Sequence, residues 1–230
     1  MPSERFFYDK PLREKKTLTI EGEEAQHLRV MRVNIGDEIE VINGKGQLAK
    51  ASVIEFHKGK VDLLATQVFD SPLREESLIL CLALPRFNRL EWVIEKGAEL
   101  GVSAFWVFPG DLSEKKELSE PQSVRLRHLL IAAIKQCGRL DLPAITLKEP
   151  LAKWVRPQGT SLFGDTDPKA PRIATPYPHP IYFFSGPEKG FSQKELDLFH
   201  RWEAKGVSLH RNILRADTAP IAAAAILSTL

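Results

Sequence analysis

The sequence IYFFSGPEKGFSQKEL, residues 181–196, decides the fold that we expect. The apolar run at 181–184 predicts a short buried strand. The loop at 185–190 is bracketed by glycines, which let a backbone approach a ligand closely. Ser192 and Glu195 match the S-x-x-E capping box that starts a helix. The order of strand, glycine loop and capped helix predicts one unit of an α/β sheet, although an ordinary strand-to-helix turn is the alternative interpretation.

A second loop of this kind follows the strand expected at 207–209. The loop HRNILRADT, residues 210–218, leads into an alanine-rich helix expected at 220–230, with a proline at its start. Asp217 or Thr218 suits the helix cap. On this local evidence Asp217 is either only a cap or a functional carboxylate, and Arg215 is either a surface cation or a ligand-binding group.

The rest of the C-terminal region alternates strand-like and helical segments, which predicts βαβ units and a mainly parallel sheet. We expect further strands at 78–84, 104–108, 144–147 and 161–163, and helices at 88–100, 122–137 and 193–205. Seven prolines between 150 and 180 predict irregular chain around one short strand. Ligands of open α/β sheets gather beyond the carboxyl ends of the strands, so the three segments after 163, 184 and 209 are the candidate site.

The N-terminal region has a different pattern, with apolar alternation in short runs separated by turn residues. The runs TLTI, EIEVI, LAKASVIEF and VDLLATQVF predict strands, and Asn43-Gly44 is a strong hairpin signal. One helix is expected at 23–33, with Ala25, Leu28 and Met31 on one face. We therefore predict a small β-barrel over residues 1–71 and an α/β domain over residues 72–230.

Composition excludes several classes of protein. With 43% hydrophobic residues in 230, the chain can bury a core, and two cysteines are too few for a disulfide framework. The six histidines lack metal-ligand spacing, so we expect no metal. We find no signal peptide and no membrane span, and expect a cytoplasmic protein. A net charge of +2 does not by itself indicate nucleic-acid binding, so RNA contacts would come from local basic clusters.

Seven segments carry a resemblance to a known family. They occur in the family's order and cover essentially the whole chain: RFFYD at 5–9, EEAQHLRVMRVNIGD at 23–37, LALPRFNRLEWVIEKGAELGV at 82–102, KQCGRLDLP at 135–143, LFGD at 162–165, FFSGPEKGFS at 183–192 and NILRADTAPIAAAAILS at 212–228. In these segments the chain resembles RsmE-type 16S rRNA uridine-N3 methyltransferases of the SPOUT superfamily. Asp217 stands where many members carry Glu.

This resemblance implies a fold and an activity. The fold would be a SPOUT-type parallel sheet with a C-terminal trefoil knot, preceded by a small PUA-like β-barrel that binds RNA. The activity would be S-adenosyl-L-methionine-dependent methylation of N3 of a uridine in 16S rRNA of the small ribosomal subunit, by a homodimer. Two other functions stay open, namely another SPOUT RNA methylation such as tRNA ribose 2′-O-methylation, or a non-catalytic RNA-binding protein of ribosome assembly.

The same resemblance and the strand-end positions give the candidate site residues. For catalysis we expect Arg215 and Asp217, with Glu188 as the alternative carboxylate. For the cofactor we expect Leu162, Phe163, Gly164, Ser185, Gly186, Pro187, Gly190, Leu209, Asn212, Ile213, Leu214, Thr218 and Ala219. For RNA we expect Arg5, Phe6, Arg29, Arg32, Arg86 and Arg139, which combine cations for phosphates with an aromatic ring for stacking. A core position in the barrel is the alternative for Phe6.

Overall fold

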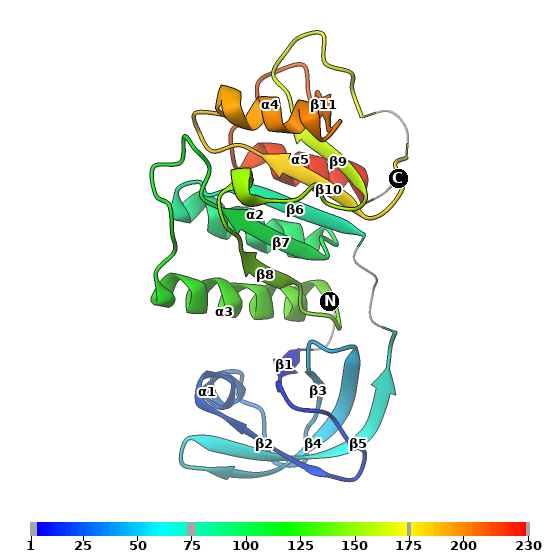
Figure 1. The fold of residues 1–230 in the computed structure, drawn as a ribbon. Coiled ribbons are helices and arrows are strands. Elements are labelled where there is room, and N and C mark those ends of the chain that lie inside the picture. Colours follow the sequence, from blue (N-terminus) through cyan, green and yellow to red (C-terminus); the bar gives the residue numbers. More distant parts are fainter. Residues whose placement is uncertain (1–3, 73–76, 174–175, 229–230) are drawn as a thin grey trace. The chain divides into compact units, whose positions relative to one another are not determined.

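The computed structural model describes residues 4–72, 77–173 and 176–228 (Figure 1). The chain forms two compact units. Unit 1 contains the described residues of 1–73 together with 131–142, and unit 2 contains the described residues of 74–130 and 143–230.

Unit 1 is a curled five-stranded sheet with one helix (Figure 1). Its elements are β1 (Arg5–Phe7), β2 (Thr17–Glu21), α1 (Gly22–Val30), β3 (Glu38–Ile42), β4 (Gln47–His57) and β5 (Lys60–Asp70). The strand order is β1-β3-β4-β5-β2, with β1 parallel to β3 and the remaining pairs antiparallel. Alternate residues of the strands point inward and form a core with Phe6, Ala25 and Leu28. The expected strands and helix of the barrel are therefore present, and β1 is an additional strand.

The end of the expected helix in unit 1 differs from the prediction. Helix α1 ends at Val30, Met31 is 39% exposed, and Arg32 has a positive φ of 56°. A left-handed residue stops a helix because the next turn cannot continue. The prediction that Met31 belongs to the buried face together with Ala25 and Leu28 is therefore wrong.

Residues 131–142 complete unit 1. Lys135 Nζ lies 2.6 Å from Glu24 Oε1, and the other oxygen of Glu24 accepts a hydrogen bond from Phe7 N–H at 3.0 Å. The backbone of Gly46 donates to Leu140 O at 2.9 Å, and Leu142 N–H donates to Gly44 O at 2.9 Å. This segment thus supplies main-chain and side-chain partners to the barrel.

Unit 2 is built on a six-stranded parallel sheet with the order β11-β9-β10-β6-β7-β8. Its strands are β6 (Leu78–Ala83), β7 (Ala104–Phe108), β8 (Ala144–Leu147), β9 (Thr160–Gly164), β10 (Ile181–Ser185) and β11 (Lys205–Val207). Its helices are α2 (Phe87–Glu99), the first part of α3 (Glu120–Cys137), the 3₁₀ turn η1 (Leu151–Lys153), α4 (Gln193–Arg201) and α5 (Thr218–Leu227). The alternating pattern therefore predicted a parallel α/β sheet correctly.

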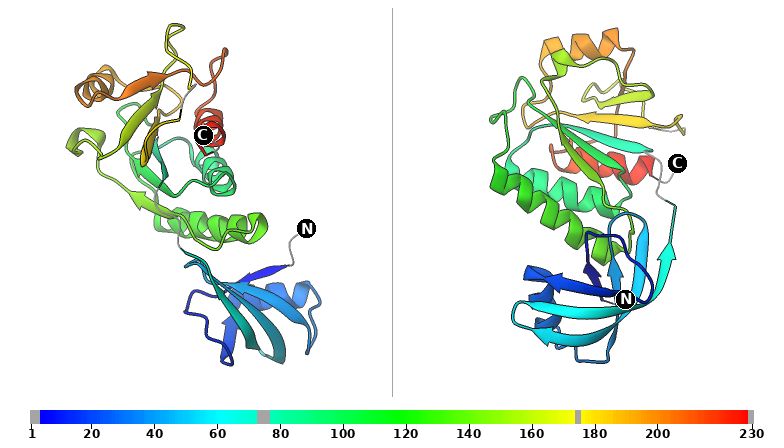
Figure 2. Two further views of the ribbon diagram at one scale, coloured as in Figure 1. Left: turned by 90° about the vertical axis from the view of Figure 1, so that its right-hand side faces the viewer. Right: turned by 60° about the horizontal axis from the view of Figure 1, so that its bottom comes forward.

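Helices cover both faces of this sheet (Figure 2). Helices α2 and α5 pack on each other on one face, and α5 also contacts β6 and β10. On the other face, Leu151 of η1, Phe199 of α4 and Trp202 at the C-cap of α4 join a cluster with inward residues of β6 and β10, such as Cys81 and Phe184. Strands covered on both faces explain why 78–83 and 181–185 are buried throughout.

The connection from α4 to β11 was predicted incorrectly. Helix α4 ends at Arg201 and not at 205, because Glu203 has a positive φ of 55° and Ala204 N–H turns back to Phe199 O at 2.9 Å. Strand β11 then spans 205–207 and not 207–209, since it pairs in register with β9, Lys205 opposite Leu162. Helix α5 also starts two residues earlier than expected, at Thr218.

Candidate active site

Three predicted loops leave the same edge of the sheet. Strands β9, β10 and β11 are neighbours and parallel, so the segments after 164, 185 and 207 begin side by side. Asp165 N–H donates to Val207 O at 3.0 Å, and a Cβ at Gly206 would meet Asp165 Oδ2 at 2.5 Å. The first and third loops are therefore in contact where they leave the sheet.

The loop after β10 is a compact glycine turn. Gly190 has a φ of +75° and its N–H donates to Pro187 O at 2.9 Å. A Cβ at Gly186 would lie 3.0 Å from the carbonyl carbon of Gly190 and 3.1 Å from its Cα. Glycine is thus required at position 186 by close backbone approach and at position 190 by backbone conformation. Ser185 and Pro187 are buried at the base of the turn.

The carboxylate of Glu188 is bound by the loop after β6 and the first turn of α2. Its Oε1 accepts from the backbone N–H of Arg86 at 3.2 Å and lies 3.2 Å from Arg89 Nε. The side chains of Arg89 and Glu188 are 23% and 22% exposed, so this ion pair is shielded from water over most of its surface. Sequence predicts Glu188 as an alternative catalytic carboxylate, and the structure gives it two partners.

The start of α4 contains the predicted capping box, which is confirmed. Ser192 Oγ accepts from Glu195 N–H at 3.2 Å, and Glu195 Oε2 accepts from Ser192 N–H at 2.8 Å. The other oxygen of Glu195 accepts from Asp111 N–H at 3.0 Å, and Ser192 Oγ lies 2.6 Å from Asp111 Oδ2. These bonds attach the loop after β7 to the start of α4.

An exposed ion pair joins the loops after β6 and β7. Arg86 binds Glu114 through Nε to Oε2 at 3.2 Å and through Nη2 to Oε1 at 2.9 Å. These hydrogen bonds raise the pKa of Arg86 and lower the pKa of Glu114, and the attraction between the two charges adds to both shifts. Arg86 is therefore exposed, as an RNA contact requires, but already holds a carboxylate.

The loop after β11 is more open. Asp217 caps α5, with its Oδ1 accepting from Thr218 N–H at 2.8 Å and from Thr218 Oγ1 at 3.1 Å. Arg215 is exposed, and its carbonyl accepts from Ala219 N–H at 2.9 Å. Ile213 is 80% exposed, which is unusual for a large apolar side chain on a folded surface. The cap that the sequence favours at Asp217 is present, and Oδ2 of this residue has no hydrogen-bond partner among the described residues.

The other predicted cofactor residues fall into two groups. Leu162 and Phe163 are buried, and Phe163 stacks on Phe199 with ring centroids 5.0 Å apart. Any ligand contact from these two would therefore use main-chain atoms. A second group lies at the surface of the strand-end loops and is accessible in whole or in part: Gly164, Leu209, Asn212, Leu214, Thr218 and Ala219.

Most predicted RNA contacts of unit 1 are engaged within the protein. Phe6 is fully buried in the barrel core, Arg5 pairs with Glu40 at 2.8 Å, and the nearly buried Arg139 pairs with Asp141. Arg29 donates to the carbonyls of His57 and Lys60. Both Arg29 and Arg32 are exposed. The burial of Phe6 therefore supports a role in the barrel core and not in stacking on RNA.

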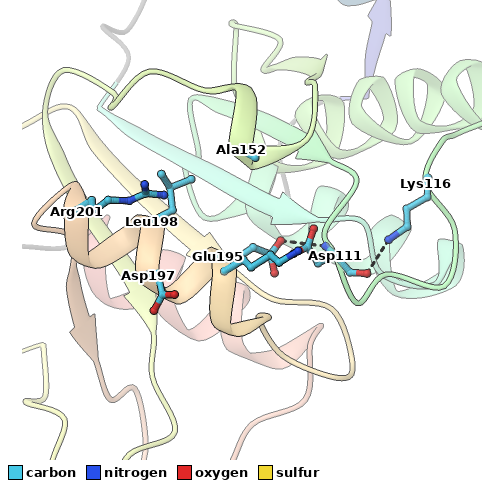
Figure 3. A pocket seen from close by; sticks show the side chains of 8 residues that line it. Asp111, Lys116, Ala152, Glu195, Asp197, Leu198 and Arg201 are labelled. Carbon is cyan, nitrogen blue, oxygen red and sulfur yellow. Dashed lines mark hydrogen bonds between the residues drawn. The ribbon is translucent and has the colours of Figure 1, made fainter.

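A hollow of about 740 Å³ lies elsewhere, between α4, η1 and the loop after β7 (Figure 3). None of the predicted cofactor residues lines it. Lys116 points to the main chain, and its Nζ donates to Gly110 O at 2.5 Å and to Asp111 O at 2.8 Å (Figure 3). Sequence reasoning passed over Asp111 and Lys116, although both follow a strand end and the rule that selected the other loops applies to them.

Comparisons with solved structures show which known fold the chain shares. A ribosomal RNA small subunit methyltransferase E from Neisseria gonorrhoeae, solved bound to S-adenosyl methionine, has a TM-score of 0.83 at 24% identity, covering 99% of this chain and 97% of that one. A protein from Legionella pneumophila, solved in complex with the same cofactor, has a TM-score of 0.87 at 24% identity, covering 100% of this chain and 98% of that one. The fold is thus one that methyltransferases use.

The family follows from sequence. The family model described as RNA methyltransferase domain matches residues 72–228, and the model described as RNA methyltransferase PUA domain matches residues 20–65. The chain therefore belongs to the RNA methyltransferase family. Ribosomal RNA small subunit methyltransferase E from Bacillus subtilis is 28% identical over 98% of this chain and 96% of its own length. These matches confirm the resemblance carried by the seven segments and the PUA-like class of the barrel, whereas the trefoil knot stays a prediction.

Proposed function

We propose that this protein transfers a methyl group from S-adenosyl-L-methionine to N3 of a uridine in 16S rRNA of the small ribosomal subunit. The observation that carries the proposal is the match over nearly the full length of both chains to relatives named for small-subunit rRNA methylation. We further propose a cytoplasmic homodimer, with residues 1–71 as the RNA-binding barrel and residues 72–230 as the methyltransferase domain. Within the described ranges, no helix has the length and apolar character that a membrane span needs.

The loops at the sheet edge fit a nucleoside cofactor. In the turn at 186–190 the backbone of Gly186 and that of Gly190 approach so closely that a Cβ at Gly186 would lie 3.0 Å from the carbonyl carbon of Gly190. The space beside Gly190 is open, so a ligand could approach the main chain there. The 80% exposed Ile213 offers apolar surface that a planar base or a partner subunit would cover. When bound, S-adenosyl-L-methionine supplies an electrophilic methyl group. The described residues contain no cluster of His, Cys, Asp and Glu suited to a metal ion.

Arg215 and Asp217 are suited to the needs of the reacting uracil. Methylation at N3 requires the N3 proton to leave, and negative charge then spreads over the neighbouring ring oxygens. A guanidinium held near those oxygens lowers the energy of that charge. Oδ2 of Asp217 remains available to accept the proton or to orient the base, while Oδ1 caps α5. We assign charge stabilisation to Arg215 and proton removal or orientation to Asp217.

RNA contacts are best placed on exposed cations. Arg32 has no hydrogen bond or ion pair from its guanidinium among the described residues, and Arg29 is exposed beside it in the chain. Arg86 serves the same purpose in unit 2 if phosphate competes with Glu114. Arg5, Phe6 and Arg139 contribute by holding the barrel together.

Two measurements test the proposed function. Calorimetric titration of the full chain with S-adenosyl-L-methionine should show saturable binding, and its absence would favour a non-catalytic RNA-binding protein. The second measurement incubates the enzyme with the methyl donor and small subunits that lack uridine-N3 methylation, then maps the modified nucleotide by mass spectrometry. The expected product is 3-methyluridine in 16S rRNA. A ribose-methylated nucleotide in tRNA would instead establish the alternative SPOUT activity.

A further inference from the structure

The start of α2 lacks an anion of its own. Its first turn contains no acidic residue, and its N-cap residue, Arg86, makes no side-chain cap. The positive end of a helix dipole and its free N–H groups favour a nearby carboxylate. Glu188, 102 residues further along the chain, supplies one by accepting from Arg86 N–H at 3.2 Å.

The same carboxylate binds the first turn of α2 through a side chain. Arg89 Nε lies 3.2 Å from Glu188 Oε1, the oxygen that also accepts from Arg86. Both partners of Glu188 therefore belong to one short segment, 86–89. Because Glu188 stands in the middle of the Gly186–Gly190 turn, the two contacts attach the tip of that turn to a rigid helix.

The base of the turn is fixed by other means. Gly186 and Gly190 are in close backbone contact, and Gly190 N–H donates to Pro187 O at 2.9 Å. Beyond the turn, the buried Glu195 of the capping box binds Asp111. The turn is thus fixed at both ends, and Glu188 is the side chain that fixes its middle.

We propose that Glu188 is a positioning residue that holds the cofactor-binding turn in its working conformation by bridging it to α2, and that it takes no proton from the substrate. This inference rests on the proposed function for the identity of the ligand. It assigns Glu188 to binding of S-adenosyl-L-methionine, whereas a general base would act on the chemical step. Preorganisation of a loop raises ligand affinity because less ordering is needed on binding.

The test uses the full chain, four single variants and one double variant that combines Glu188→Ala with Arg89→Ala. Glu188→Ala removes both contacts, Glu188→Gln keeps an oxygen for Arg86 N–H but loses the charge, and Arg89→Ala removes only the ion pair. Glu91→Gln is the matched control, because Glu91 is also a partly buried glutamate of unit 2 paired with an arginine, which in this case is Arg125 of α3. Hydrogen exchange of the peptide 183–192 is measured without ligand, and calorimetry gives the dissociation constant for S-adenosyl-L-methionine.

We expect Glu188→Ala to weaken cofactor binding on the order of tenfold, the usual effect of losing a charge-assisted hydrogen bond. Exchange of peptide 183–192 should be faster. Glu188→Gln and Arg89→Ala should show smaller changes in the same direction, and adding Arg89→Ala to Glu188→Ala should have little further effect, because the two residues act together. For Glu188→Gln, KM for S-adenosyl-L-methionine should rise by a larger factor than kcat falls, and the pH profile of kcat should keep both limbs.

Two results would overturn the inference. One is wild-type exchange and cofactor affinity in Glu188→Ala. The other is a fall of about a hundredfold in kcat for Glu188→Gln at saturating cofactor, with loss of one limb of the pH profile, which would make Glu188 a base. If the wild type binds no cofactor, the proposed function fails, while the exchange of peptide 183–192 still decides whether Glu188 holds the turn.

Discussion

The loops after β10 and β11 leave two parallel strands that lie on either side of β9, but the two loops are bonded to the rest of the protein in different ways. The loop at 186–192 is attached to α2 through Glu188 and to the loop after β7 through Ser192. The loop at 208–217 is bonded to a distant segment at Ser208, which forms a parallel bridge with Arg172 and donates its N–H to Pro171 O at 2.9 Å. Its other bonds are local, such as Asn212 N–H to His210 Nδ1 at 3.1 Å.

We propose that this difference separates two tasks of the transferase site. A loop with many internal partners is preorganised and suits the binding of a ligand of constant shape. A loop with an exposed arginine, an exposed isoleucine and a carboxylate oxygen without a partner among the described residues keeps its groups available for a second reactant. We therefore expect changes in the first loop to alter affinity and stability, and changes in the second to alter the rate.

The largest effect is expected for Asp217→Asn. The amide can still cap α5 through its oxygen but cannot accept a proton, so single-turnover methylation should fall by about 10²–10⁴-fold. Melting and cofactor affinity should stay at wild-type values, because a lost cap costs only about 1 kcal/mol and this variant keeps the cap. Near wild-type methylation would leave Asp217 as a structural cap and would remove the contrast between the two loops.

Next in size is Gly186→Ala in the preorganised loop. The new Cβ would meet the carbonyl carbon of Gly190 at 3.0 Å, and backbone cannot yield as a flexible side chain can. We expect a loss of about 1–3 kcal/mol in the free energy of unfolding, and weaker cofactor binding. Gly164→Ala is the control for thermal melting, since its nearest neighbour, Phe183 Cζ, would be at an ordinary 3.6 Å. Equal melting temperatures for both variants would show that the turn is not tightly packed.

A smaller effect, on RNA affinity, is expected for Arg32→Ala in unit 1. The comparison there is between one arginine that binds other groups of the protein and one that does not. The guanidinium of Arg32 has no partner among the described residues, whereas that of Arg29 holds two carbonyls of the β4–β5 turn. Arg32→Ala should weaken RNA binding and leave melting unchanged. The slope of log affinity against log salt concentration should become shallower by about 0.7–0.9 for each phosphate that is no longer neutralised. Arg29→Ala should also lower the melting temperature. An unchanged salt dependence in Arg32→Ala would exclude a phosphate contact.

The smallest effect, on the free energy of unfolding, is expected when the exposed ion pair between Arg86 and Glu114 is removed. Hydrogen bonds from Arg86 lower the pKa of Glu114 in the folded state, so the pair stabilises the fold above the ordinary pKa of glutamate. That contribution is lost as pH falls through the lower folded value. The stability difference between wild type and Glu114→Gln, measured by denaturant unfolding, should therefore vanish in acid and shrink in high salt. A difference that grew in acid would contradict the assigned cause.

Elements with strong local signals could be predicted from sequence. Strands β7 and β8 coincide with the segments expected at 104–108 and 144–147, and the capping box at Ser192 is present. The glycine loop was recognisable because two glycines bracket a short segment between an apolar run and a capping box. In each case the decisive physical chemistry lies within a few consecutive residues.

Features set by distant partners could not be predicted in this way. Strand β11 is placed by its register with β9, which overrides the local apolar run at 207–209. Strand β1 contains three residues and exists because β3 lies beside it. The partners of Glu188 lie about a hundred residues away in sequence, so its type and spacing alone suggested a base. The role of a charged residue depends on what it touches.

Helix α3 passes from one compact unit to the other, with 120–130 in unit 2 and 131–137 in unit 1. This has a consequence for synthesis on the ribosome, where N-terminal domains generally fold first. The barrel cannot acquire all its partners when its first 73 residues emerge, because Lys135, Leu140 and Leu142 are made later. Until these residues are made, Glu24 lacks its ion-pair partner, and the main chain at Gly44 and Gly46 lacks two of its hydrogen bonds. The nascent barrel is therefore completed only after the first two strands of the parallel sheet have been translated.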